Sequence, residues 1–217
     1  FGVNLESREL GAYRLRNILG SIGTLRRSIG TVSGIETVAI NTGSVANTAQ
    51  TTGTIGWTPT TTNGGVTLTV TGANQLTTGV ITPVGTGLVS INASGMTAQA
   101  AGTSTLITVA PVSTGGTVSI VGSAGQDVLI GDIDNRNTII GGAGVDTVTG
   151  GSAADNLSGE DGIDSITGGG GNDTISGGGG NDLLFATLAA ADTVNIDGGA
   201  GKAQEFGDLV FVAEVFA

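Results

Sequence analysis

The 217-residue chain contains no cysteine and no histidine. Disulfide bonds and thiolate metal sites are therefore excluded, together with imidazole zinc sites and a serine–histidine–aspartate catalytic triad. No run of about 20 apolar residues occurs, so the sequence predicts no transmembrane helix. The first residues also lack the charged, apolar and small-residue order of a Sec signal peptide, so we expect any export to use another route.

Aromatic residues make up only 3% of the chain and charged residues 12%. By contrast there are 41 glycines, about one residue in five, against a usual share near 7%. This composition does not suit a core of large side chains. It suits a thin β architecture, in which valine, isoleucine, leucine and threonine pack in layers and glycine occupies the corners.

The net charge of −11 is unevenly distributed along the chain. Residues 1–34 carry five arginines against two glutamates, or +3, and residues 35–121 carry only Glu36, or −1. Residues 122–217 carry fifteen acidic residues against Arg136 and Lys202, or −13. These steps predict three regions, and the acidic balance argues against nucleic acid as the main partner.

Residues 1–34 predict a short, basic helical arm. Apolar residues from Leu10 to Ile29 recur near helical spacing, and Ser7 can cap the helix start. Gly20 and Gly23 leave one helix or two short helices open. The arm could pack on its own domain, or it could dock onto a neighbouring subunit or an anionic surface. The contact residues for docking are Arg8, Arg14, Arg16, Arg26 and Arg27.

Residues 35–121 predict a Thr/Gly/Val-rich β domain that is almost free of charge. "GVTLTVTG" alternates apolar residues with threonine, and "LVSINASG" and "GTVSIVG" alternate similarly. Alternation of period two with glycine-rich breaks is typical of half-buried strands joined by tight turns. Surfaces of isolated soluble domains normally carry charges of both signs. Two interpretations fit the missing charge: much of this surface lies against other subunits, or the domain has a low-complexity origin.

Residues 122–185 contain a nonapeptide repeat. The copies begin at residues 122, 132, 141, 150, 159, 168 and 177, and only Gly131 stands outside the frame. The copies from residue 168 onward read "GGGGNDTIS" and "GGGGNDLLF". Position six is acidic or amide throughout: Asp127, Asn137, Asp146, Asp155, Asp164, Asp173 and Asp182. Position eight is always apolar: Leu129, Ile139, Val148, Leu157, Ile166, Ile175 and Leu184.

The repeat resembles the calcium-binding nonapeptide G-G-x-G-x-D-x-U-x of the RTX (repeat-in-toxin) β-roll. The resemblance implies a parallel β-roll in which six residues form a turn and three form a strand. One coil then takes two repeats, so the loops of repeats n and n+2 stack, and position eight points into the narrow interior. Stacked aspartates repel one another, and a Ca²⁺ ion between them reverses the sign of that interaction because calcium takes six to eight oxygen ligands.

The resemblance also implies two rows of about five Ca²⁺ ions in total. One row uses Asp127, Asp146, Asp164 and Asp182, and the other uses Asn137, Asp155 and Asp173, with Asp192 as a further candidate. Backbone carbonyls of the first four loop positions complete the sites. These are Gly142, Gly144, Gly159 and Asp161; Gly151, Ala153, Gly168 and Gly170; and Glu160, Gly162, Gly177 and Gly179.

The pattern departs from the family at "GDIDNRNTII", where Asn137 replaces aspartate and Arg136 adds positive charge. The flanking ions of that row are therefore uncertain in the sequence. Residues 186–217 resemble a degenerate closing repeat that caps the roll. Their last residues, Glu214 to Ala217, are similar to the C-terminal signal of type I secretion substrates, which implies a secreted, extracellular or cell-surface protein.

No general acid, base and nucleophile cluster outside the repeats, so we expect no enzymatic activity. The composition of the middle region is similar to that of bacterial surface-layer and adhesin proteins. The sequence therefore predicts a calcium-stabilised structural protein that assembles with copies of itself on a surface. Two alternatives stay open: a decoration or fibre protein on a virion, docked through the basic arm, and an RTX adhesin module that binds a glycan.

Overall fold

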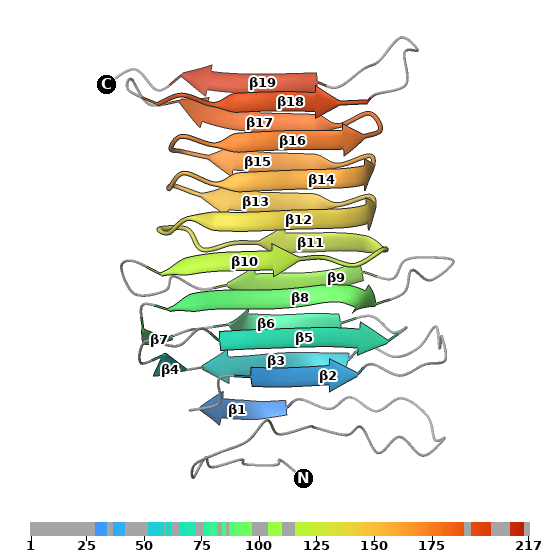
Figure 1. Ribbon diagram of the computed structural model, residues 1–217, viewed down its shortest axis with the longest axis vertical. Coiled ribbons are helices and arrows are strands. Elements are labelled where there is room, and N and C mark those ends of the chain that lie inside the picture. Colours follow the sequence, from blue (N-terminus) through green and yellow to red (C-terminus); the bar gives the residue numbers. More distant parts are fainter. Residues whose placement is uncertain are drawn as a thin grey trace.

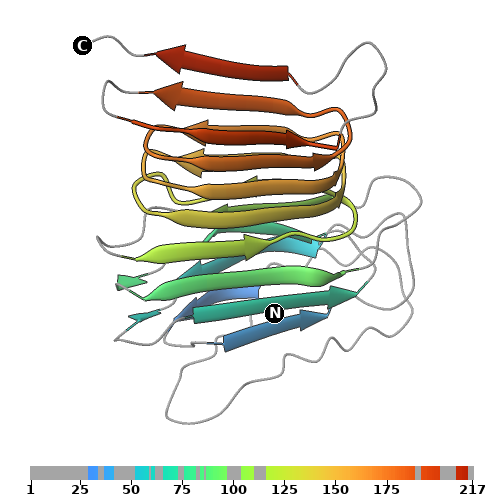
Figure 2. The same ribbon diagram turned by 45° about the horizontal axis from the view of Figure 1, so that its top comes forward.

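The computed structural model describes residues 29–33, 37–41, 52–58, 60–61, 66–72, 76–81, 84–85, 87–96, 104–109, 116–188, 192–200 and 209–214. Regular structure in these ranges consists of β-strands alone. The strands form two long sheets that face each other as the walls of a flattened tube, and loops join the walls at both sides (Figures 1 and 2). The mainly β class expected from the composition is confirmed.

The two sheets contain alternate strands of the chain. One sheet has the order β1 (Ile29–Ser33), β3 (Thr52–Thr58), β6 (Leu76–Ile81), β9 (Ser104–Val109), β11 (Gln126–Ile130), β13 (Thr147–Gly151), β15 (Ser165–Gly169), β17 (Leu183–Leu188) and β19 (Leu209–Glu214). The other has the order β2 (Thr37–Asn41), β5 (Val66–Gly72), β8 (Leu88–Met96), β10 (Thr117–Val121), β12 (Asn137–Gly144), β14 (Asn156–Gly162), β16 (Thr174–Gly179) and β18 (Asn195–Gly199). The short strands β4 (Thr60–Thr61) and β7 (Val84–Gly85) form a separate pair.

The strands pair in parallel with the strand one full coil away in the sequence. In the repeat block this offset is 18 residues, as in Ile139 with Leu157 and Ile166 with Leu184. Between β11 and β13 the offset is 19 residues, because Gly131 adds one residue to that coil. The parallel roll, with loops n and n+2 stacked, is therefore confirmed.

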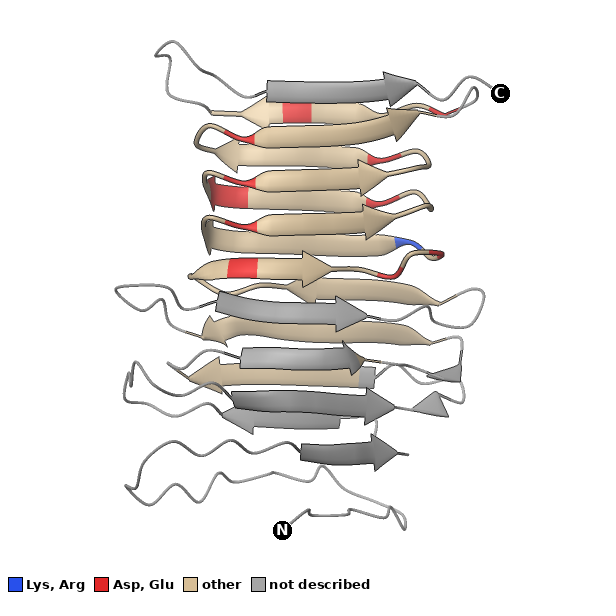
Figure 3. Cartoon of the chain, turned by 180° about the vertical axis from the view of Figure 1, so that it is seen from behind, with Lys and Arg blue, Asp and Glu red and all other residues tan. Residues whose placement is uncertain are grey.

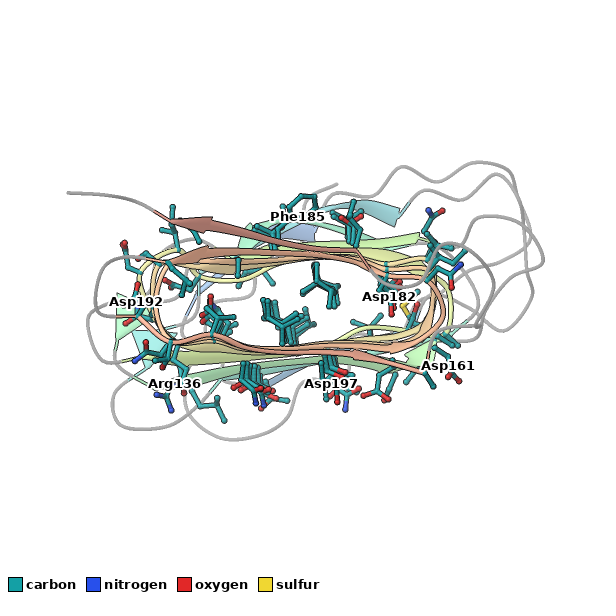
Figure 4. The ribbon with its side chains drawn as sticks, turned by 90° about the horizontal axis from the view of Figure 1, so that it is seen from above. Arg136, Asp161, Asp182, Phe185, Asp192 and Asp197 are labelled. Carbon is teal, nitrogen blue, oxygen red and sulfur yellow. The ribbon has the colours of Figure 1, made fainter. Side chains whose placement is uncertain are left out.

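A single apolar layer fills the space between the two walls. Side chains alternate along each strand, so every second residue points inward. All seven position-eight side chains, from Leu129 to Leu184, are at most 1% exposed. Val194 and Ile196 of the last coil pack against the same core. Viewed down the long axis, these side chains lie inside the tube, while Phe185 and Asp197 point outward from opposite walls (Figure 4).

The change of composition at Gly122 does not interrupt the sheets. Strand β10, at the end of the uncharged region, pairs with β8 on one side and with β12 of the repeat block on the other. Strand β11 likewise pairs with β9 and β13. The core is also continuous, since Leu68, Ile91 and Ile120 belong to the same buried cluster as the position-eight residues. The uncharged region and the acidic repeats thus form successive coils of one roll.

The helical arm expected for residues 1–34 is not supported. Residues 1–28, including the five arginines, lie outside the described residues, and the prediction was wrong for the segment that follows. Ile29–Ser33 forms β1, which pairs in parallel with β3 through Ile29 opposite Ile55. The segment "IGTVS" is rich in β-branched residues, which fit a pleated strand better than a helix.

The last coil consists of β18 and β19, which extend the two sheets beyond β16 and β17. Asn195 lies opposite Thr174 and Ile196 opposite Ile175, so the closing segment copies the repeat register. Among the described strands, β18 and β19 each pair on one side only. Glu214 ends β19, and residues 215–217, with most of the proposed secretion signal, lie outside the described residues.

Truncation of a position-eight side chain tests the core. We expect Ile166→Ala to lower the free energy of unfolding by about 2–5 kcal/mol, because Ile166 is fully buried in a layer one side chain thick. The matched control is Ile163→Ala, since Ile163 is 59% exposed three residues earlier and should change stability by less than about 0.5 kcal/mol. Denaturant unfolding at saturating calcium measures both. Equal effects of the two substitutions would contradict this assignment of the core.

Candidate metal centre

Buried acidic side chains form two rows at the narrow ends of the roll. Figure 3 shows the acidic residues gathered in the loops on both sides of the repeat block, and Figure 4 shows Asp182 and Asp192 at opposite ends of the tube. One row contains Asp127, Asp146, Asp164 and Asp182, and the other Asn137, Asp155 and Asp173; all seven side chains are at most 3% exposed. Aspartate is rarely buried to this degree unless it is paired or bound.

A ladder of hydrogen bonds connects the side chains of each row. The backbone N–H of Asp127 donates to Asp146 Oδ1 at 2.8 Å, and that of Asp146 donates to Asp164 Oδ1 at 2.8 Å. The N–H of Asp164 continues the row to Asp182 Oδ1 at 2.9 Å. In the second row Asn137 donates to Asp155 Oδ1 at 2.7 Å, and Asp155 N–H donates to Asp173 Oδ1 at 3.0 Å. Each Oδ1 atom is thereby fixed one coil from the next.

The other carboxylate oxygen is unsatisfied in much of the ladder. Asp146 Oδ2, Asp164 Oδ2 and Asp173 Oδ2 are buried and have no hydrogen-bond partner. A buried acceptor without a partner costs about 1–3 kcal/mol, and more when it is charged. Burial therefore raises the pKa of Asp146 to about 7, although the N–H of Asp127 opposes the shift and the charges of Asp127 and Asp164 add to it.

Burial raises the other pKa values in the same direction. It raises the pKa of Asp155 and of Asp164 to about 6, against hydrogen bonds from Asn137 and Asp146 respectively. It also raises the pKa of Asp173, and the nearby charge of Asp192 adds to the shift. The rows are thus arranged so that either a proton or a cation is needed to compensate the negative charge.

The space beside these orphan oxygens is lined by oxygen atoms. A Cβ atom placed on Gly141 would lie 2.5 Å from Asp146 Oδ2 and 2.8 Å from the carbonyl oxygen of Gly159 in the next stacked loop. A Cβ on Gly159 would meet Asp164 Oδ2 and, at 2.6 Å, the carbonyl oxygen of Gly177. Two acceptors converge on each point. Glycine at position one leaves this space open, and hard oxygen donors of this kind fit Ca²⁺.

The carbonyls expected as ligands lie in the same stacked loops. The position-four carbonyls of Gly144, Ala153 and Gly162 face position four of the next loop in their row. The Gly151 carbonyl accepts the N–H of Gly170 at 3.0 Å, and the Glu160 carbonyl faces Gly178. The Gly168 carbonyl lies 2.6 Å from a Cβ placed on Gly150, beside Asp155 Oδ2. The remaining candidates, Gly142, Asp161 and Gly179, belong to these same loops.

Among the described residues no three acidic side chains gather around one point. The carboxylates meet in stacked pairs, so the rest of a coordination shell has to come from backbone carbonyls. Asp192 lies near Asp173 and accepts the N–H of Gly171 at 3.4 Å. However, the register places Val194, and not Asp192, opposite Asp173, because Asn195 pairs with Thr174. The sequence did not reveal this two-residue displacement.

Three further polar residues in the first two loops were missed by the sequence reasoning. Ser123, Asp132 and Asn135 are buried, and they hydrogen-bond to the position-six residues of their own loops or to one another. The available signal was a side chain at position two of the repeat, where glycine is usual. Ser123 and Asp132 both occupy that position.

The fold and the rows define a class of protein: a parallel β-roll with buried, stacked aspartates that fit calcium. Residues 113–136, 122–157, 133–166 and 149–184 match the family described as RTX calcium-binding nonapeptide repeat (4 copies). This part of the chain therefore belongs to the RTX calcium-binding repeats. No curated protein and no solved structure matches the chain. Within the part that the structure describes, no helix is long and apolar enough to cross a membrane.

The raised pKa values predict how the calcium-free roll responds to pH. A buried aspartate whose pKa rises from 3.8 to about 6 or 7 binds its proton more tightly when folded. Its contribution is fully present below about pH 4 and is lost as the pH rises through 6 to 7. In buffer stripped of calcium by a chelating resin, we expect the melting temperature to fall between about pH 5 and pH 8.

Saturating calcium should reverse this trend, because calcium binds the deprotonated carboxylates. Circular dichroism melts at several pH values, with and without calcium, measure both dependences. A calcium-free melting temperature that rises with pH would contradict the assignment of buried carboxylates without a compensating charge.

The position of an aspartate in its row predicts the effect of its removal. Asp164 lies between Asp146 and Asp182, whereas Asp127 ends the row. We expect Asp164→Asn to raise the calcium concentration needed for folding by more than about tenfold, because it weakens two neighbouring sites. The matched control Asp127→Asn should have a smaller effect. Calorimetric calcium titration compares them, and equal losses would show that the sites are not shared along the row.

Proposed function

We propose that this chain is a calcium-stabilised, non-enzymatic structural protein that assembles with copies of itself on a surface. The observation that carries the proposal is the combination of two kinds of coil in one roll. The acidic coils need compensating charge at the rows, whereas residues 37–126 contain no charged residue. A protein with these properties is calcium-dependent at one end and free of electrostatic repulsion at the other.

Calcium concentration supports a location outside the cell. Extracellular calcium modules work with dissociation constants of about 10⁻⁴–10⁻³ M. Where calcium is scarce, the rows stay uncompensated and their charges oppose folding. Where it is plentiful, about five Ca²⁺ ions would offset about ten charges of the repeat block. The repeat block then no longer repels its copies over a Debye length of about 8 Å in physiological salt.

The described strands offer surfaces for assembly. Strands β18 and β19 end the two sheets, and among the described strands each is paired on one side only. Such edges are templates for pairing with another chain unless charge, proline or a bulge protects them. The sequence of β19, "LVFVAE", carries one charge, at its last residue. Addition of a second copy at this end would continue both sheets.

A second candidate, a glycan-binding adhesin module, is favoured by one specific observation. A row of hydroxyl and amide side chains runs along the outer face of the β2–β18 sheet, with one residue from each coil. In register these are Thr67, Ser90, Ser119, Thr138, Asn156, Thr174 and Asn195. Uncharged donors and acceptors on a flat wall suit sugar hydroxyls. Binding of the calcium-loaded, monomeric protein to a glycan array would support this candidate.

Self-assembly should require calcium specifically. We expect light scattering at high protein concentration to rise when Ca²⁺ is added and to fall after excess chelator, because chelation removes both the fold of the acidic coils and their neutralisation. Mg²⁺ at equal concentration is the control, since it has the same charge but demands a rigid octahedral site and holds its water. A particle that stays monomeric in calcium would overturn the assembly proposal and leave the adhesin module as the better candidate.

A further inference from the structure

The loops of the repeat block adopt two different conformations. In three loops the N–H of position two donates to the side chain of position six in the same loop. These bonds run from Ser123 to Asp127 Oδ2 at 2.5 Å, from Asp132 to Asn137 Oδ1 at 2.7 Å and from Gly151 to Asp155 Oδ2 at 2.7 Å. We refer to these three loops, at residues 122–127, 131–137 and 150–155, as closed loops.

In four other loops position two has a positive φ angle. The values are 118° at Gly142, 76° at Glu160, 99° at Gly169 and 106° at Gly178. We refer to these loops, at residues 141–146, 159–164, 168–173 and 177–182, as open loops. Their position-one carbonyls face the preceding loop of the row, as the carbonyls of Gly159 and Gly177 do. The orphan Oδ2 atoms of Asp146, Asp164 and Asp173 all belong to open loops.

The first coil of the repeat block, residues 122–139, is the one in which both loops are closed. At one end the Ser123 hydroxyl lies 3.0 Å from Asp127 Oδ1 and 2.9 Å from Asp127 Oδ2, and it also accepts the N–H of Gly125. This side chain therefore places a donor against the carboxylate. The equivalent position in the later loops of this row is Gly142, Glu160 and Gly178, none of which is printed with such a bond to its aspartate.

At the other end of the first coil, the Asn137 amide takes the place of an acidic side chain. Its Nδ2 atom lies 2.8 Å from the Asp132 carbonyl oxygen, 3.0 Å from the Asn135 carbonyl oxygen and 3.0 Å from Asp155 Oδ1. One NH₂ group thus contacts three oxygens, two from its own loop and one from the next. Asp132 Oδ1 closes the loop further by accepting the N–H groups of Asp134 and Asn135.

The first coil also rests on coils that contain no charge. Strands β11 and β12 pair in register with β9 and β10, and the buried side chains of Val118 and Ile120 continue the core beneath Leu129 and Ile139. Apolar packing and backbone pairing of this kind need no cation. The first coil therefore has both a neighbour that is independent of calcium and loops whose acceptors meet donors.

We propose that residues 122–139 form a calcium-independent starter coil, in which the Ser123 hydroxyl and the Asn137 amide take the place of cations. The calcium-dependent part of the roll then begins at the loop of Asp146. The starter coil presents two ordered strand edges, from β11 and β12, on which the acidic coils fold when calcium arrives.

Glu160 supports the distinction between the two kinds of loop. Its φ of 76° is the one positive value recorded for a non-glycine among the described residues. A left-handed backbone is unfavourable for any residue with a Cβ atom. Ser123 and Asp132 occupy the same repeat position without a positive φ. An open loop that accepts this strain at Glu160 needs an additional interaction to hold it, and a closed loop does not.

Hydrogen–deuterium exchange of the full chain tests the proposal, at a protein concentration low enough to keep it monomeric. In chelator, the amides of Asp127, Asn135 and Asn137 should exchange within about threefold of their rates in calcium. The amides of Asp164 and Ser165 should exchange on the order of tenfold faster or more once calcium is removed. If both groups lose protection at the same calcium concentration, the starter coil does not exist. The outcome does not depend on whether the chain assembles.

A pair of variants then tests the role of the amide. Asn137→Asp removes the Nδ2 donor and restores the usual repeat residue, so protection of the first coil in chelator should fall on the order of tenfold and return with calcium. Asn156→Asp is the matched control, because Asn156 is exposed on β14 and the same charge is added there. Unchanged protection in Asn137→Asp would overturn the role of Asn137. If that variant does not fold, the exchange of the unaltered chain still decides between the outcomes.

Discussion

The structure depends on the close approach of oxygen atoms at the two narrow ends of the roll. Stacking one coil on the next brings an aspartate Oδ2 and a glycine carbonyl toward the same point, with no hydrogen between them. This approach requires glycine at position one, and it raises the pKa of Asp146, Asp155 and Asp164 by burial. The apolar layer between the sheets is thin, so it has little surplus stability with which to offset these groups. Folding of the acidic coils is therefore coupled to whatever compensates the charge.

The two parts of the roll solve the same packing problem in different ways. Both use parallel strands with alternating side chains and one continuous core, as shown by Ile120 and Ile139 in adjacent coils. The uncharged coils satisfy their strands without acidic loops. The acidic coils add stacked carboxylates, which make the fold conditional on the surrounding solution. The closed loops of Ser123 and Asn137 lie where these two solutions meet.

The sequence predicted the features that follow directly from the repeat. A period of nine with an apolar residue at position eight implies inward side chains in two sheets, and all of these residues are buried. The stacking of Asp146 on Asp164 follows from the same period. The continuity of the sheets across Gly122 did not follow, because the spacing of the uncharged strands is irregular and composition does not encode strand order.

Other features required coordinates because they depend on local backbone geometry. The strand at Ile29 was interpreted as part of a helix, since its apolar residues also fit a helical spacing and its partner β3 lies more than 20 residues away. The displacement of Asp192 from the row arises from the irregular link before β18. Loop closure by Ser123 and Asn137 depends on the φ angle at position two, which the sequence suggests only through the absence of glycine there.

Because consecutive strands belong to opposite walls, the number of nonapeptides has a parity. Duplication or deletion of one nonapeptide would transfer every later strand to the other sheet, so that β19 would continue the wall that now ends in β18. The aspartates would still stack, since every repeat is equivalent within its row. The closing coil, however, would be rotated by half a turn relative to the uncharged coils. Gain or loss of repeats in pairs keeps the two ends of the molecule facing the same way, whereas an odd change inverts one end against the other.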